Sequence, residues 1–125
     1  MTRAMRGWIP AVLWAAAIFW VSSRPKVPVP DTLGADKLLH FGAYALLGFL
    51  LARGASGSGL APRWPVALGW LYGVSDEVHQ SFVPGRSADP ADWLADALGV
   101  VAGTLLYVRF GSPRRGRVPG STSDR

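Results

Sequence analysis

The chain has 125 residues, enough for one domain, with a formal net charge of +5 and no cysteine. The lack of cysteine excludes disulfides, thiolate chemistry and cysteine-based metal sites. Half of the residues are hydrophobic and only 17% are charged, below the roughly 25% usual in soluble proteins. The basic residues lie at the chain ends and in loops beside apolar runs. This placement favours a membrane protein over a nucleic-acid-binding one, so no nucleic-acid partner is expected.

Four apolar segments predict helices at about 7–22, 36–52, 64–83 and 91–110. A helix needs about 20 residues to cross a bilayer. The last two segments have that length, whereas the first two are short and would need flanking residues or a thinner bilayer. Six tryptophans also fit membrane interfaces. We therefore predict an all-α, membrane-spanning four-helix bundle with short loops, formed by residues 1–110 in contact with the lipid bilayer.

The breaks between these segments are marked by helix-breaking and turn-forming residues. Residues 23–30 contain three prolines, residues 53–59 are rich in glycine and serine, and Pro84-Gly85 is a turn signal. Residues 111–125 are polar and rich in glycine, proline and arginine. They are predicted to form a disordered cytoplasmic tail.

The basic residues predict the orientation in the membrane. With four spans, both termini and the second loop share a side, which carries one acid, Asp124, and nine basic residues: Arg3, Arg6, Arg53, Arg63, Arg109, Arg114, Arg115, Arg117 and Arg125. The other side carries Arg24, Lys26, Lys37 and Arg86 and the seven remaining acids. The positive-inside rule then predicts cytoplasmic termini.

A cleaved signal peptide at residues 1–23 is the alternative for the first segment, which has a basic start, an apolar centre and Ser22-Ser23 at its end. Pro10 and the three bulky tryptophans of this segment are unusual in a signal peptide. Its removal would leave three spans and move one terminus to the other side.

Asp36, His40 and Tyr44 recur at i, i+4 and i+8, so they share one helical face, with Lys37 beside them. Such groups are rare at bilayer depth without a partner or a function. The structural alternative is that Asp36 caps the helix and Lys37 reaches to the interface. That alternative explains neither His40 nor Tyr44.

Asp76, Glu77 and Gln80 form a second cluster on one face of the third segment. Adjacent carboxylates repel each other, so either one keeps a proton or a cation lies between them. We therefore expect a general base or a divalent-cation site at Asp76 and Glu77. The alternative is two acids at a helix end, balanced by Lys37 and Arg86.

Asp92, Asp96, Gly99 and Gly103 share one face of the fourth segment. The Gly-xxx-Gly pair predicts close approach of another helix. Asp96 lies about one turn into the span and should need a partner of opposite charge. Arg86 or Lys37 could be that partner.

Four neighbouring polar residues are assigned simpler roles. Asp89 precedes Pro90 and is predicted to cap the fourth helix, and His79 is expected to be peripheral. Ser22 and Ser23 lack a G-x-S-x-G elbow, so hydroxyl groups at a helix end are a better interpretation than a nucleophile.

Together these motifs resemble the VanZ-like family of small bacterial membrane proteins, named after a teicoplanin-resistance determinant. The matching elements are Ser22-Ser23, Asp36-Lys37, His40, Tyr44, Gly73, Asp76-Glu77, Gln80, Phe82, Pro84, Arg86, Asp92, Gly99 and Gly103. Asp96 departs from the pattern, since it stands where the family usually has Asn. The resemblance implies a multi-pass protein of the bacterial plasma membrane with a link to glycopeptide or envelope stress, and it implies no settled reaction.

Two functional hypotheses follow. In the first, Asp76, Glu77 and His40 are catalytic, and Lys37, Tyr44, Gln80, Arg86, Asp92 and Asp96 bind a lipid-linked envelope precursor at the outer membrane face. In the second, the same charges form an ion-paired pocket that captures a lipid headgroup, a cell-wall peptide or a glycopeptide, with pairs such as Asp76–Lys37 and Asp92–Arg86. A transporter is a weaker third hypothesis, because four spans are few and no half is duplicated.

Overall fold

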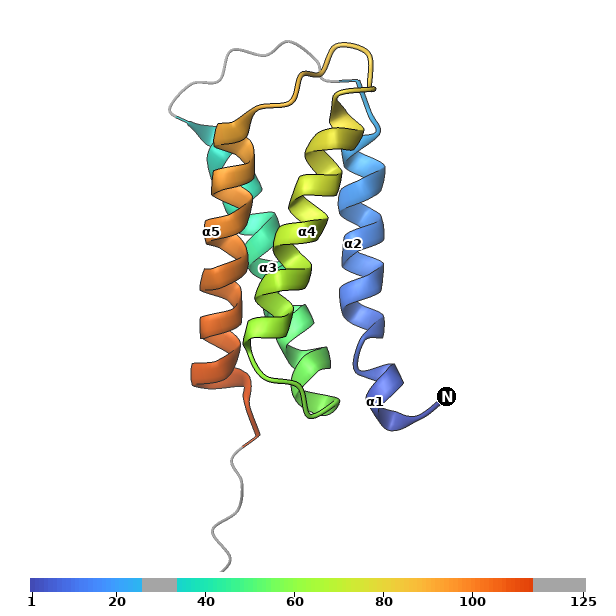
Figure 1. Cartoon of the computed structure of the whole chain (residues 1–125), viewed down its shortest axis with the longest axis vertical. Helices are drawn as coiled ribbons and strands as arrows, with labels where there is room; N and C mark the ends of the chain where they lie inside the picture. Colours follow the sequence, from blue (N-terminus) through green and yellow to red (C-terminus); the bar gives the residue numbers. More distant parts are fainter. Residues whose placement is uncertain (26–33, 114–125) are drawn as a thin grey trace, which may run out of the picture.

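The computed structural model describes residues 1–25 and 34–113, and these ranges are helical apart from short connections. The elements are α1 (Arg3–Arg6), α2 (Ile9–Ser22), α3 (Ala35–Gly57), α4 (Arg63–Gln80), α5 (Pro90–Leu106) and the π-helical turn η1 (Tyr107–Gly111). The four long helices α2 to α5 run alternately up and down (Figure 1). The predicted all-α four-helix bundle is confirmed. The disorder predicted for the tail falls almost entirely on residues 114–125, outside the described residues.

Within residues 1–25 and 34–113, three helical stretches are long and apolar enough to cross a membrane by length and composition: Arg3–Ser22, Ala35–Gly57 and Pro90–Gly111. The first two segments reach this length by including flanking residues, as expected: α2 alone has 14 residues, and α1 extends the first stretch at its start. The helix α3 has 23 residues, because it continues through Gly54 and Gly57 instead of ending at the glycine-rich stretch. Glycine weakens a helix by only about 1 kcal/mol per residue, and this stretch contains no proline.

The helix α4 differs from the other long helices in composition. Its 18 residues include Arg63, Asp76 and Glu77, so it is not among the stretches apolar enough to span by themselves. Both carboxylates are buried against the neighbouring helices. The position of α4 in a membrane therefore depends on its partners in the bundle.

The closest helix pair is α3 with α5, and glycines create it. A Cβ atom on Gly103 would lie 2.7 Å from the carbonyl carbon of Ala45, and one on Gly99 would lie 3.0 Å from the Ala45 nitrogen. On the other side of the contact, a Cβ on Gly48 would lie 2.9 Å from the Cα of Val100. The predicted Gly-xxx-Gly contact is therefore confirmed.

The bundle has a polar interior at one end and an apolar exterior. The buried polar residues include Asp76, Glu77, Gln80, Asp92 and Asp96, whereas large hydrophobic side chains such as Leu13, Leu38, Leu71 and Leu98 are exposed on α2, α3, α4 and α5. Soluble proteins show the opposite distribution. Polar groups turned inward and apolar groups turned outward are what a lipid environment requires.

Candidate functional site

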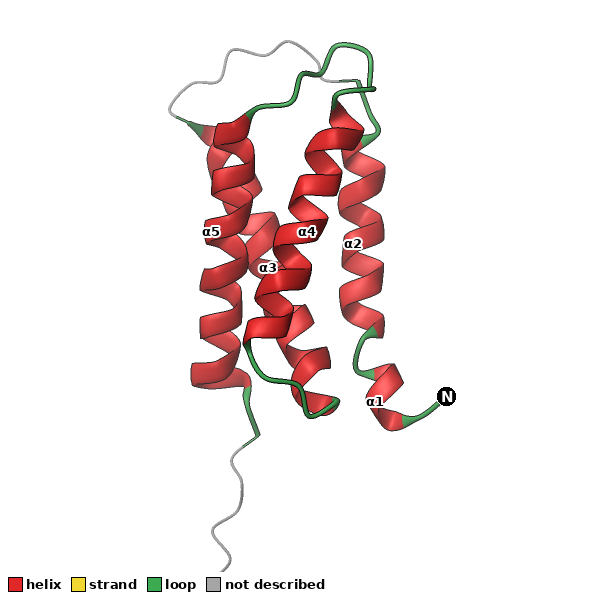
Figure 2. Cartoon of the chain, viewed as in Figure 1, coloured by secondary structure: helices red, strands yellow, loops and turns green. Residues whose placement is uncertain are grey.

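The three polar clusters meet at one end of the bundle. Because the helices alternate in direction, the start of α3, the end of α4 and the start of α5 lie together, beside the loop that joins α4 to α5 (Figure 2). These elements bring Lys37, His40, Tyr44, Asp76, Glu77, Gln80, Asp92 and Asp96 to one region. The described N-terminus and η1 lie at the opposite end.

His40 and Asp96 form the central pair of this region. The Nδ1 atom of His40 lies 2.8 Å from Oδ1 of Asp96, whose side chain is 1% exposed. The Nε2 atom of His40 lies 3.8 Å from carboxylate oxygens of Asp36 and Asp92. The prediction of Arg86 or Lys37 as the partner of Asp96 was wrong. His40 takes that place because it lies almost one turn deeper along α3 than Lys37.

Lys37 connects the start of α3 to the start of α5. Its ammonium group donates to Asp92 and, at 2.9 Å, to Asp89, and it lies 3.7 Å from Asp36. The hydrogen bond from Lys37, followed by that from the N–H of Ala91, holds the pKa of Asp89 below its usual range. Asp89 also accepts the Ala91 N–H at 2.9 Å as the N-cap of α5. The predicted capping role of Asp89 is confirmed.

Asp36 is not the N-terminal cap of α3, which was the structural alternative for this residue. The N-cap of α3 is Gly34, whose φ of 70° suits glycine, and Asp36 lies in the first turn. Its carboxylate faces Lys37 and His40 at 3.7 and 3.8 Å.

Asp76 pairs with Tyr44 deep in the bundle. The Tyr44 hydroxyl donates to Oδ2 of Asp76 at 3.0 Å, and both side chains are buried. The predicted Asp76–Lys37 pair was wrong, because Lys37 lies two turns nearer the helix end than Tyr44. The second oxygen of Asp76, Oδ1, is buried and has no hydrogen-bond partner among the described residues.

Glu77 faces His40 and Asp96 rather than Asp76. Its Oε2 accepts the backbone N–H of Asp89 at 3.1 Å. Its Oε1, like Oδ2 of Asp96, is buried without a hydrogen-bond partner in the part of the chain that the structure describes. One potential ligand atom from each of His40, Glu77 and Asp96 lies within 4.8 Å of the other two. The two such groups found among the described residues do not include Asp76, so a cation shared by adjacent Asp76 and Glu77 is not what the geometry favours.

A polar cavity of about 230 Å³ opens at this end of the bundle. Its lining includes Lys37, His40, Gln80, Arg86, Asp89 and Asp92. The predicted Asp92–Arg86 pair was wrong. The Arg86 side chain instead donates to the carbonyl oxygens of Arg24 and Val21, at 2.8 and 3.4 Å. The last carbonyl groups of a helix lack intrahelical partners and are free to accept hydrogen bonds. Arg86 therefore links the loop between α4 and α5 to the end of α2.

The sequence interpretation missed a contact between His79 and Ser23. The Nε2 atom of His79 lies 2.9 Å from the Ser23 hydroxyl, and its ring stacks on Phe19 at 4.5 Å. His79 is half-buried and is not part of the polar cavity's lining, so it joins α4 to α2 at the periphery. The Ser-Ser pair in the sequence was the available signal for this contact.

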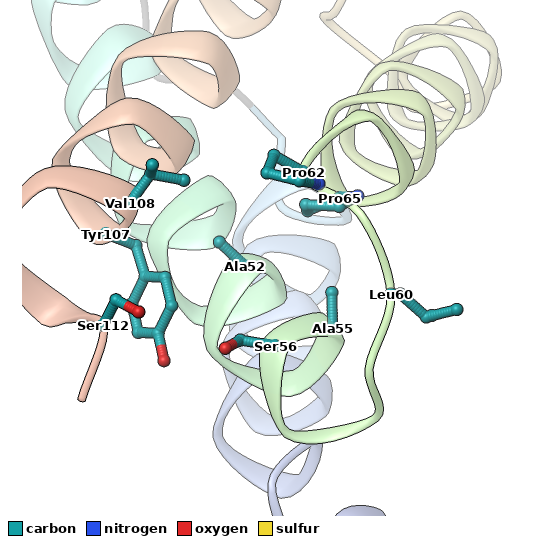
Figure 3. A pocket seen from close by; sticks show the side chains of 9 residues that line it. All are labelled: Ala52, Ala55, Ser56, Leu60, Pro62, Pro65, Tyr107, Val108 and Ser112. Carbon is teal, nitrogen blue, oxygen red and sulfur yellow. The ribbon is translucent and has the colours of Figure 1, made fainter. Parts of the chain in front are cut away.

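A second cavity, of about 180 Å³, lies at the opposite end (Figure 3). It is lined by Ala52, Ala55, Ser56, Leu60, Pro62, Pro65, Tyr107, Val108 and Ser112. No carboxylate, histidine or basic residue belongs to this lining. This cavity therefore lacks the carboxylates and imidazole that line the polar cavity.

Comparison with known proteins identifies a family that matches this chain. A family model described as VanZ/LLP1 matches residues 5–111, which include all four long helices and the polar region. Neither the curated proteins nor the solved structures contain a significant match.

Proposed function

This chain belongs to the VanZ/LLP1 family, and we propose that it is a multi-pass enzyme of the bacterial plasma membrane that modifies a lipid-linked precursor of the cell envelope. A contribution to glycopeptide (teicoplanin) resistance is part of the same proposal. The main supporting observation is that His40, held 2.8 Å from buried Asp96, lines a polar cavity. A histidine oriented by a carboxylate and reachable from a cavity is a typical general acid–base group.

The roles of the residues follow from their positions. His40, Asp96 and Glu77 form the acid–base centre, since they are within 4.8 Å of one another. Lys37 and Arg86 line the cavity and carry the positive charge that an anionic precursor needs. Gln80 and Asp92 also line it and supply hydrogen bonds, while Tyr44 and Asp76 support the centre from below.

The orientation follows from the charge distribution. Nine of the 13 basic residues lie on the side of the termini, so in this proposal both termini are cytoplasmic and the cavity faces outward. Reporter fusions after residue 60 and at the C-terminus should both report a cytoplasmic position. A periplasmic position for either fusion would contradict this topology.

A deletion strain complemented with variants tests the activity. The deletion strain should accumulate the precursor and tolerate little teicoplanin. The His40→Gln variant should fail to correct either defect. The matched control is His79→Gln, which changes the other histidine, outside the cavity, and should restore the wild-type state. Precursors are measured by mass spectrometry of membrane extracts. Full complementation by His40→Gln would refute the proposal.

A non-catalytic binder is the second candidate, favoured by a specific observation. Lys37 already contacts three carboxylates and Arg86 already donates to two backbone carbonyls. Such internally satisfied charges are typical of a preformed binding pocket. Purified protein that retains a precursor without changing its mass would favour this candidate over the enzyme.

A further inference from the structure

We infer that His40, Glu77 and Asp96 bind a divalent transition-metal ion, such as Zn²⁺ or Mn²⁺, in the polar end of the bundle. The inference deepens the proposed function, on which its catalytic meaning rests, by naming the cofactor of the acid–base centre. The ion itself is inferred from geometry and burial alone.

The donor atoms suit such an ion in kind and nearly in distance. One imidazole and two carboxylates, contributed by α3, α4 and α5, are ligands that Zn²⁺ and Mn²⁺ accept. Their ligand atoms lie within 4.8 Å of one another. Metal–ligand bonds of about 2.1 Å place ligand atoms at most about 4.2 Å apart. Small side-chain rotations are therefore sufficient to close the site.

Two buried carboxylate oxygens without a hydrogen-bond partner in the described part of the chain support a cation site. Glu77 and Asp96 are 7% and 1% exposed, and Oε1 of Glu77 and Oδ2 of Asp96 have no hydrogen-bond partner among the described residues. Buried carboxylate oxygens without partners are costly. Lys37 is engaged with Asp89 and Asp92 instead. A divalent ion would neutralise both carboxylates and coordinate both oxygens.

The competing group of Asp36, His40 and Asp92 is less suitable. Asp92 is already bonded to the Lys37 ammonium group, whose positive charge would repel an ion there. Ca²⁺ is disfavoured at the inferred site because it prefers six to eight oxygen ligands.

The site leaves at least one coordination position for water or substrate. Three protein ligands with an open position are typical of catalytic rather than structural metal sites. Because His40 lines the cavity, that position is reachable from it. An ion bound there would be held by His40, Glu77 and Asp96, and it would supply acid–base chemistry by lowering the pKa of a water at the open position.

Metal analysis of the full-length chain, purified in detergent without chelators, tests the inference. Zinc and manganese are measured by mass spectrometry, and the chelated protein is then titrated with Zn²⁺ and Mn²⁺. Wild type should bind about one ion per chain. His40→Gln and Glu77→Gln should each weaken binding by roughly ten- to hundredfold or more.

A matched control separates ligand loss from unfolding. His79→Gln changes the other histidine, which is outside the lining of the polar cavity, so this variant should bind metal like wild type. A wild type without metal affinity would overturn the inference. Equal affinity in wild type and all variants would show adventitious binding only and would overturn it as well. Metal loss is measured on purified protein, so the inference can fail while precursor processing persists, and processing can fail while metal binding persists.

Discussion

The hydroxyl group of Tyr44 is the hydrogen-bond donor to the Asp76 side chain in the interior of the bundle. The contact measures 3.0 Å and both residues are almost fully buried. The other Asp76 oxygen has no partner among the described residues. A carboxylate in such surroundings depends strongly on this one hydrogen bond.

Removal of this hydroxyl should therefore destabilise the fold. Tyr44→Phe should cost about 1–3 kcal/mol, because it leaves Asp76 buried without a donor. The double variant Tyr44→Phe/Asp76→Leu removes both polar groups and should recover most of this loss. Thermal unfolding in detergent measures both. A double variant less stable than Tyr44→Phe would show that Asp76 has another partner.

The Asp89 carboxylate should make the stability of the fold depend on pH, with stability lost as the pH falls. Because Lys37 lowers its pKa, its stabilising effect is present above the usual carboxyl pKa and is lost as the pH falls through the lowered value. Asp89→Asn keeps a capping side chain but removes the charge. Its melting temperature should be below that of wild type by a constant amount from pH 8 to about pH 5, and the difference should shrink only below about pH 4. A difference that already shrinks between pH 7 and pH 5 would contradict this assignment.

The residues of the polar region could be predicted from the sequence, but their pairing could not. Charged residues in apolar helices with spacings of three and four identified His40, Asp76, Glu77 and Asp96. The pairs depend on how deep each residue lies along two different helices. Helical spacing along one chain segment does not contain that information, so Lys37 and Arg86 were assigned to the wrong carboxylates.

Among the helix contacts, the packing of the bundle depends most on the close contact between α3 and α5. Gly103 allows the Ala45 carbonyl group to approach its backbone. Gly103→Leu should push these helices apart and destabilise the bundle by about 1–3 kcal/mol or more. Membrane abundance, measured by immunoblotting of membranes, should fall accordingly.

Gly42→Ala is the matched control for this variant. Gly42 lies in α3, and a Cβ atom there would meet no atom within 4 Å. It should leave abundance unchanged or raise it, since alanine favours helix over glycine. If both variants lose abundance equally, close packing at Gly103 is not the cause.

Helix number and type were predictable from hydrophobicity, whereas one helix end was not. Apolar segments bounded by prolines or turn residues marked all four long helices. The end of α3 was placed too early because residues 53–57 have loop-like composition. Ala55 and Gly54 are buried there, so packing stabilises a helix that local preference alone would not predict.

In the molecule as a whole, the polar end of the bundle holds the buried carboxylates, which are costly for stability and carry the groups proposed for chemistry. In the described part of the chain, three stretches are long and apolar enough to cross a membrane by themselves, and α4 contributes both Asp76 and Glu77 to the interior. In our proposal, α4 retains these costly carboxylates for function rather than for stability. Glu77 is the better residue for a test. Among the described residues, one of its oxygens has no hydrogen-bond partner and the other accepts the backbone N–H of Asp89.

The most direct test measures Glu77→Gln for membrane abundance, melting temperature and precursor processing in the same cells. The substitution keeps the size of the side chain and removes its charge. Abundance should stay at the wild-type level, and the melting temperature of the chelated, metal-free protein should equal or exceed that of chelated wild type, because a neutral amide is less costly to bury than a carboxylate. Processing and glycopeptide tolerance should be lost. Loss of abundance as severe as that of Gly103→Leu would instead make Glu77 a structural residue and contradict the functional centre.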